Sequence, residues 1–232
     1  GYGKMGKTIE QIALKRGHEI VAKIDRENQN DIELLKSKGS EVVIEFTNPE
    51  AAFDNITTCL TQRIPTVSGS TGWLDKKPKA EEITRLNDTA FFYASNFSVG
   101  VNIFFKLNKF LAKIMSQFPD YEVKMEEIHH TQKLDSPSGT AITLAEGFME
   151  EYPGVKKWVN EESSDKSTLG IVSKRIENVP GTHIMTYKNL IDTIEIRHEA
   201  HNREGFATGA VLAAEFIVGK KGVFGMDDML SL

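Results

Sequence analysis

Hydrophobic and polar residues alternate in two different ways along this chain. In its first part, short apolar runs are separated by stretches with helical periodicity. The apolar runs are 41–46, 64–67 and 90–93, and helical stretches lie at 31–38 and 49–60. Strands and helices that alternate in this order form a parallel sheet. The pattern therefore predicts an α/β domain with a Rossmann-type parallel sheet.

The chain opens on a G-x-G-x-x-G turn at residues 1–6, followed by a helical stripe that ends at Gly17. Residues 18–26 are predicted to form a strand ending at Asp25, about twenty residues after the turn, where a carboxylate can reach an adenosine ribose. Arg26 beside it suits a 2′-phosphate, so NADH and NADPH are both open. A glycine turn that only packs a helix on a sheet is the alternative.

The glycine fingerprint also calls for a strand directly before the first glycine. No such strand precedes Gly1. We therefore expect the native N-terminal strand to be missing from this sequence.

The second part of the chain predicts a long helix and strands of a different sheet. The helix covers 99–118, with apolar residues along one side. Strands are predicted at 121–129, 169–176, 182–187 and 193–200, the last three antiparallel, with the turn 178–181 joining the first two of them. These strands predict a smaller α+β domain with a mixed or antiparallel sheet whose face could pack on another subunit.

The end of the chain is predicted to return to the first domain. An apolar helix at 205–219 and the segment 223–230 follow the last strand. The expected domains are 1–98 with 205–232 for the dinucleotide, and 99–204 for substrate and oligomerisation.

Candidate chemistry is concentrated in residues 126–141. Residues 121–129 have the period-two pattern of a half-buried strand, so His129 and His130 are expected at its end. A helix should begin near 138–140, with Asp135 or Ser136 as the N-cap and Pro137 in its first turn. Backbone N–H groups at a helix start bind anions, and Gly139 would let a carboxylate approach them.

His129, His130 and Lys133 would place donors and titratable groups beside that anion. An ordinary strand-loop-helix connection is the alternative interpretation. A metal site is disfavoured, because neighbouring strand residues point to opposite faces and the two imidazoles would not meet on one ion. Arg203, near the end of the last predicted strand, could pair with a substrate carboxylate.

Composition narrows the class of protein. The 232 residues are 40% hydrophobic and 26% charged, with a formal net charge of -5 and no basic run, so a nucleic-acid partner is not expected. Cys59 is the single cysteine, which suits a reducing compartment, and no run of ~18 apolar residues predicts a membrane span. A cytoplasmic enzyme is the expectation.

With these motifs in view, the chain resembles the 4-hydroxy-tetrahydrodipicolinate reductase family over nearly its whole length. The segments that carry the resemblance are 127–130, Lys133, 135–141 and 94–100. The resemblance implies a dinucleotide site lined by Gly1, Gly3, Lys4, Met5, Gly6, Asp25, Arg26, Gly69, Ser70, Thr71, Ala94, Ser95, Asn96 and Phe97. It also implies that His130, Lys133, Gly139 and Thr140 hold a dicarboxylate substrate, and that His129 and Lys133 transfer protons.

The family further implies NADH or NADPH as cofactor, hydride transfer with loss of water to give tetrahydrodipicolinate in lysine and diaminopimelate biosynthesis, and a homotetramer. Ser70 stands where a threonine is common, and the glycine loop is shorter than in many members. Two other functions stay open: a dinucleotide-sensing regulator without the chemistry, and another small reductase that acts on an imine or amino acid.

Overall fold

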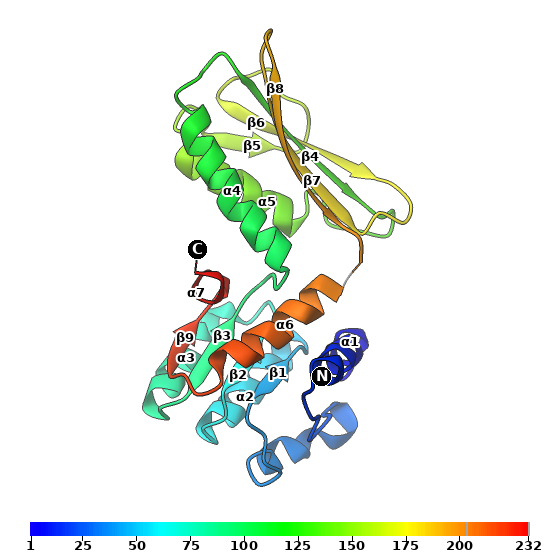
Figure 1. Ribbon diagram of the computed structural model, residues 1–232, viewed down its shortest axis with the longest axis vertical. Helices are drawn as coiled ribbons and strands as arrows, with labels where there is room; N and C mark the ends of the chain where they lie inside the picture. Colours follow the sequence, from blue (N-terminus) through cyan, green and yellow to red (C-terminus); the bar gives the residue numbers. More distant parts are fainter. Residues whose placement is uncertain (203, 232) are drawn as a thin grey trace. The chain divides into compact units, whose positions relative to one another are not determined.

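A computed structural model describes residues 1–202 and 204–231. The chain divides into two compact units, the first formed by 1–99 and 204–232 and the second by 100–203 (Figure 1). Within the described residues, no helix combines the length and the apolar character needed to cross a membrane.

The first unit is built on a four-stranded parallel sheet, as the sequence predicts. Its strand order is β1-β2-β3-β9. The strands are β1 (Val43–Glu45), β2 (Thr66–Ser68), β3 (Ala90–Tyr93) and β9 (Gly222–Phe224). Because β9 pairs with β3, the end of the chain is part of this unit.

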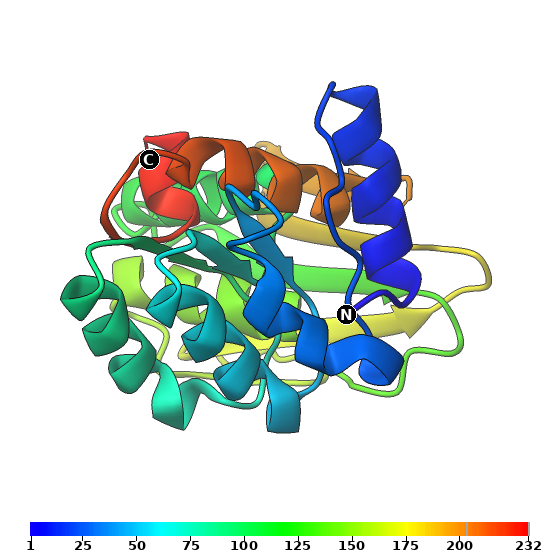
Figure 2. The same ribbon diagram turned by 90° about the horizontal axis from the view of Figure 1, so that it is seen from below.

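Helices cover both faces of this sheet (Figure 2). The helical segments are α1 (Lys4–Lys15), η1 (Arg26–Leu34), α2 (Pro49–Thr61), η2 (Leu74–Lys76), α3 (Lys77–Leu86), α6 (Glu204–Ile217) and α7 (Met226–Leu230). Successive side chains of a strand point to opposite faces. Phe91 accordingly packs in a cluster with residues of α2 and α3, whereas Phe92 packs in a cluster with residues of α1 and α6.

The strand predicted for residues 18–26 is absent. Residues 18–25 have no regular secondary structure, and Arg26 already belongs to the 3₁₀ helix η1. A strand is stabilised by its ladder of hydrogen bonds, and 18–25 pair with no strand of the described sheets. Instead they border a cavity whose other wall includes residues 42–47.

The second unit contains a mixed five-stranded sheet with the order β5-β6-β4-β7-β8. Its strands are β4 (Glu122–His129), β5 (Lys157–Val159), β6 (Thr168–Arg175), β7 (Gly181–Lys188) and β8 (Thr193–Ala200). β7 and β8 form the predicted antiparallel pair. β6 and β7 also run antiparallel, as predicted, but they are not neighbours in the sheet, because β4 lies between them and runs parallel to β6.

Two helices, α4 (Val99–Met115) and α5 (Gly139–Glu151), pack on one face of this sheet. Phe104 of α4, Phe148 of α5 and Met125 of β4 belong to the same buried cluster. The buried Asn108 of α4 donates a 2.8 Å hydrogen bond to the carbonyl of Leu144. This bond fixes α4 against α5 and therefore helps to place the start of α5 beside the end of β4.

Candidate active site

The carboxyl end of β4 brings together polar residues from four strands. The ladders align Glu127 with His183 of β7, and His183 with His198 of β8. His129 is aligned with Arg175 of β6. Residues opposite one another in a sheet share a face. Met125, Glu127 and His129 occupy alternate positions of β4 and all point to its buried face. The site therefore lies on the side of the sheet that packs on the core.

Glu127 is a fully buried carboxylate with several donors around it. Its two oxygens accept hydrogen bonds of 3.1 and 3.2 Å from the backbone N–H of Ser138. The guanidinium of Arg175 lies 3.3 Å from Oε1. Burial by itself would raise the pKa of Glu127, but the interactions with His129 and Ser138 outweigh it and hold that pKa well below its usual range. Glu127 is therefore a permanent buried anion.

His129 lies against this anion. Its Nδ1 is shielded from solvent and is 3.2 Å from Oε2 of Glu127. On the other side of the ring, a Cβ placed on Gly181 would approach Nε2 to 3.0 Å. The glycine at the start of β7 thus leaves the space that the imidazole occupies.

His183 completes the cluster, although no pattern in the sequence marks it as a site residue. Its ring meets that of His129 edge to face, with centroids 5.1 Å apart, and its Nε2 is 3.2 Å from the hydroxyl of Ser138. Burial, with a smaller contribution from the neighbouring His129, lowers the pKa of His183 to about 3. His183 is therefore neutral at physiological pH.

The loop from His130 to Ser138 carries the predicted substrate residues. Lys133 is partly buried and pairs with Asp135 at 2.8 Å. The N-cap of α5 is Ser138, whose hydroxyl accepts a hydrogen bond from the N–H of Ala141, so the predicted caps Asp135 and Ser136 are wrong. Asp135 lies in the loop before the helix, where its carbonyl accepts a 2.6 Å hydrogen bond from Arg175.

Gly139 and Thr140 are the first two residues of α5. A Cβ added to Gly139 would meet no atom within 4 Å, so open space adjoins the helix start there. A helix start next to open space is a suitable place for a carboxylate. The structure thus brings Gly139 and Thr140 to the same helix start whose cap contacts Glu127.

Glu127, His129 and His183 offer ligand atoms that all lie within 4.8 Å of one another. That separation alone would permit a metal ion. However, the carboxylate already accepts hydrogen bonds from the guanidinium of Arg175 and from the Ser138 amide. The positive charge of Arg175 beside the carboxylate disfavours a divalent metal ion there. Glu127 is therefore better suited to contact the imidazole than to bind a metal.

The first unit contains a cavity of about 880 Å³ that borders the glycine turn. Gly1, Gly3, Gly6, Asp25 and Arg26 line it. Gly3 is the N-cap of α1 and makes no side-chain cap, and a Cβ there would meet nothing within 4 Å. The turn therefore presents an open helix start, which fits a dinucleotide pyrophosphate.

The other predicted members of this site lie in varied surroundings. Lys4 is exposed at the start of α1, whereas Met5 packs on the core. Ser95 is exposed and Asn96 half-buried, but Ala94 and the ring of Phe97 belong to the core. Phe97 could therefore contact a dinucleotide only through its backbone. Asp25 caps η1 by accepting a hydrogen bond from the N–H of Arg26. Arg203 lies outside the described residues.

Glu45, at the carboxyl end of β1, is a second buried carboxylate, which the sequence analysis does not identify. It accepts hydrogen bonds from the hydroxyls of Ser68 and Ser70, at 2.6 and 2.9 Å, and from that of Thr47. The Ser70 hydroxyl is also 2.7 Å from the N–H of Thr47. Glu45 thus ties the predicted cofactor loop, Gly69 to Thr71, to the loop after β1. Gly69 is half-buried and Thr71 is exposed.

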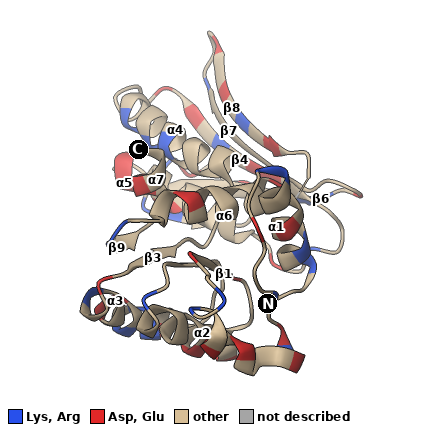
Figure 3. Cartoon of the chain, turned by 60° about the horizontal axis from the view of Figure 1, so that its bottom comes forward, with Lys and Arg blue, Asp and Glu red and all other residues tan. Residues whose placement is uncertain are grey.

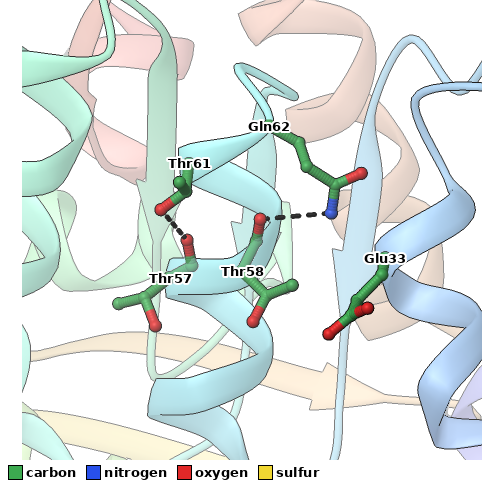
Figure 4. A pocket seen from close by; sticks show the side chains of 5 residues that line it. All are labelled: Glu33, Thr57, Thr58, Thr61 and Gln62. Carbon is green, nitrogen blue, oxygen red and sulfur yellow. Dashed lines mark hydrogen bonds between the residues drawn. The ribbon is translucent and has the colours of Figure 1, made fainter.

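Another cavity of the first unit, of about 320 Å³, lies between α2 and η1 (Figure 4). Part of its polar lining is engaged in local hydrogen bonds: Thr61 donates to the Thr57 carbonyl, and Gln62 to the carbonyls of Thr58 and Ile32. Basic and acidic segments are interspersed in both units in Figure 3, without a continuous basic stripe in that view.

A reductase needs a place for a reduced dinucleotide and groups that supply a proton when hydride is transferred. The glycine turn over a parallel sheet meets the first need, and the buried imidazole with a nearby lysine suits the second. The class that these two features define is the nicotinamide-dependent oxidoreductases.

The chain belongs to the dihydrodipicolinate reductase family. Residues 1–97 match the family model described as "Dihydrodipicolinate reductase, N-terminus", and residues 100–230 match that of its C-terminus. A curated 4-hydroxy-tetrahydrodipicolinate reductase of Christiangramia forsetii is 54% identical over 231 residues, covering 100% of this chain and 95% of the relative. That of Alkaliphilus oremlandii is 34% identical, covering 99% and 95%.

Solved structures agree on the fold. A dipicolinate-bound dihydrodipicolinate reductase from Paenisporosarcina superposes with a TM-score of 0.78 at 23% identity, covering 97% of this chain and 95% of that one. An amine dehydrogenase from Mycobacterium smegmatis has a TM-score of 0.63 at 9% identity, with coverages of 98% and 93%. At these identities the likeness is one of fold.

The neutral, buried His183 should make stability depend on pH. The unfolded chain binds a proton there near pH 6.5, whereas the folded chain does so only near pH 3, so the stability that His183 contributes is present above pH 6.5 and is lost as pH falls. Between pH 7 and pH 5 this residue should lower the free energy of unfolding by about 2 kcal/mol. Urea denaturation of wild type and of His183→Gln at both pH values measures it.

His201→Gln, which replaces an exposed histidine, serves as the control and should behave like wild type. An equal loss of stability on acidification in wild type and His183→Gln would contradict the assignment.

Proposed function

We propose that this protein reduces 4-hydroxy-tetrahydrodipicolinate to tetrahydrodipicolinate with loss of water, in lysine and diaminopimelate biosynthesis. The first unit would bind NADH or NADPH and the second the dicarboxylate substrate. The observation that carries the proposal is the buried His129, which lies at a strand end beside the helix start of Gly139 in a chain that belongs to this reductase family.

The substrate residues support this assignment by their chemistry. The N-terminus of α5 favours a negative charge, and Gly139 leaves space for a carboxylate. Lys133 and His130 would contact the carboxylates, with Thr140 at the second position of the helix. Arg203 would be a further carboxylate partner. A substrate with two carboxylates matches this concentration of donors in a chain with a net charge of -5.

The reduced nicotinamide, when bound, supplies the hydride. His129 and Lys133 would provide the proton for the carbon adjacent to the one that receives the hydride. The imidazole fits the role because either ring nitrogen of a histidine can carry and release a proton, and His129 is buried at the end of β4. Lys133, paired with the more exposed Asp135, can add positive charge next to the substrate.

We also propose that the protein is a cytoplasmic homotetramer whose second units pair through their sheets. Two fully exposed apolar residues, Leu190 and Ile191, lie between β7 and β8, and Ile176 and Ile194 are also exposed. Exposed apolar groups of this kind are common at subunit interfaces. The single cysteine is in keeping with a reducing compartment.

Steady-state kinetics with freshly generated substrate test the proton donors. His129→Gln and Lys133→Ala should each lower kcat by ~10²- to 10⁴-fold, because each would remove a group that acts in proton delivery. Lys133→Ala should also raise KM, and His130→Gln should mainly raise KM. The double mutant should lose less than the product of the two single effects.

Lys113→Ala, at an exposed position of α4, is the control and should leave both constants near those of wild type. If His129→Gln turns over normally while hydride transfer limits the rate, His129 is not the donor.

Cofactor selection is tested at Asp25. Asp25→Ala should raise KM for NADH roughly ten-fold and KM for NADPH less, since a carboxylate binds the free ribose hydroxyls. Asp25→Asn separates this role from capping, because asparagine caps a helix as well as aspartate does. Like Asp25→Ala, it should raise KM for NADH more than KM for NADPH, but it should keep the stability of wild type. Equal weakening of both cofactors would place Asp25 outside the ribose site.

Sedimentation equilibrium tests the assembly. Wild type should have the mass of four chains, and the double variant Leu190→Glu/Ile191→Glu should give smaller species, because buried charges oppose association. Leu86→Glu, which alters an exposed leucine of the first unit, is the control and should remain tetrameric. A monomeric wild type would exclude the proposed interface.

A further inference from the structure

Glu127 is the one fully buried carboxylate that contacts His129 in the described part of the chain, and the reaction proposed above gives it no task. Burying a charge costs several kcal/mol unless partners compensate it. An apolar residue would serve packing better at this position, next to Met125 in the core. The position of the charge therefore needs an explanation, and its contacts indicate one.

Each oxygen of Glu127 has a different neighbourhood. Oε1 is close to the guanidinium of Arg175, at 3.3 Å, and Oε2 is close to Nδ1 of His129, at 3.2 Å. The Ser138 amide donates to both. The Arg175 guanidinium lies at Oε1, which leaves Oε2 to face the imidazole. The ring is not yet aligned for a linear hydrogen bond, as is common in catalytic pairs before substrate binds.

Other charged or titratable groups also face this imidazole. His183 of β7 is neutral, as shown above, and His198 of β8 lies one strand further, where burial lowers its pKa. Arg175 of β6 and Lys133 with Asp135 in the loop are the remaining groups. Of all these, Glu127 is the anion recorded in direct contact with the ring.

We propose that Glu127 is a positioning residue for the proton donor: it lies against Nδ1 of His129, which leaves Nε2 as the nitrogen that gives up the proton, and it stabilises the imidazolium with its charge. This inference rests on the proposed function, since it takes His129 as the donor. In the step itself the Nε2–H bond breaks and the proton goes to the substrate carbon next to the one that receives the hydride. The ring is left neutral with its proton on Nδ1, and solvent returns a proton to Nε2.

Two neighbours limit the alternatives. Gly181 lies on the other side of the ring, where an added Cβ would be 3.0 Å from Nε2 and 3.2 Å from Cδ2, so the glycine leaves the imidazole its place. Arg175 contacts the same carboxylate but also holds the loop through the carbonyl of Asp135. A purely structural role of Glu127 would therefore resemble that of Arg175, which makes Arg175 the matched control.

The decisive variant is Glu127→Gln, which keeps the shape and removes the charge. It should lower kcat by roughly 10- to 100-fold, the usual effect of losing a group that orients another, with little change in KM for NADH or NADPH. The alkaline limb of the profile of kcat against pH should move to lower pH, because the variant lacks the negative charge that faces the ring. Glu127→Asp should recover part of the activity and of the profile.

Arg175→Gln should behave differently. It removes a cation near the site, so its alkaline limb should stay in place or move to higher pH, even if the loop and the protein are destabilised. If Glu127→Gln and Arg175→Gln lower kcat alike without moving the limb, Glu127 is only a scaffold residue and the inference is wrong. A Glu127→Gln enzyme with the kcat and pH profile of wild type would also overturn it.

A measurement that needs no turnover keeps the inference testable if a variant is inactive. In the ¹⁵N spectrum of histidine-labelled protein at high pH, His129 should carry its proton on Nδ1 in wild type and Glu127→Asp. In Glu127→Gln it should shift toward the usual Nε2 form. Wild-type protein with the proton on Nε2 would contradict the inference.

Failure of the proposed function would look different from failure of this inference. If wild type does not oxidise NADH or NADPH with the dicarboxylate substrate, the reaction assignment is wrong, whatever the spectra show. If wild type turns over and the spectra and profiles of Glu127→Gln match it, only the role of Glu127 is lost.

Discussion

A carboxylate that is removed from water has to be surrounded by donors, and the second unit is arranged around that constraint. Glu127 contacts the amide of Ser138 before α5, the guanidinium of Arg175 in β6 and the imidazole of His129 at the end of its own strand. Each of these partners belongs to a different segment. Removing any one would leave part of the charge uncompensated, so the positions of the loop, the helix start and the histidine depend on one another.

The first unit uses the same device with different partners. Glu45 is buried at the carboxyl end of β1, where hydroxyl groups from the loops after β1 and β2 surround it. Ligands of parallel sheets bind beyond the carboxyl ends of the strands. In both units, therefore, a buried carboxylate at a strand end fixes the loops that are proposed to bind a ligand. The side chains that donate hydrogen bonds to Glu45 are hydroxyls, whereas Glu127 also has the guanidinium of Arg175.

The sequence predicts local patterns well and long-range neighbours poorly. The alternation in 121–129 locates β4, and the residues around Gly139 locate the start of α5 to within one helical turn. Strand order is decided by contacts between distant segments, and so β4 lies between β6 and β7, although β6 and β7 follow each other in the sequence. The segment 18–26 has the composition of a strand but no partner in the described sheets.

The candidate site divides in the same way. His129, Lys133 and Gly139 stand out because they are close together in the sequence. His183, Arg175 and Glu45 become visible only when the ladders place them. Glu127 did carry a signal, since it occupies the same period-two positions as Met125 and His129, and a charge in an apolar series demands a partner.

Gly181 shows how such a site limits transfer to other scaffolds. In the sequence it follows a proline and looks like an ordinary turn residue, yet its missing side chain sets the volume in which the His129 ring can sit. A designer who copied only the histidine, the lysine and the helix start would have no reason to keep it. Any larger residue there would press on the imidazole and displace it, although all the other catalytic groups were present.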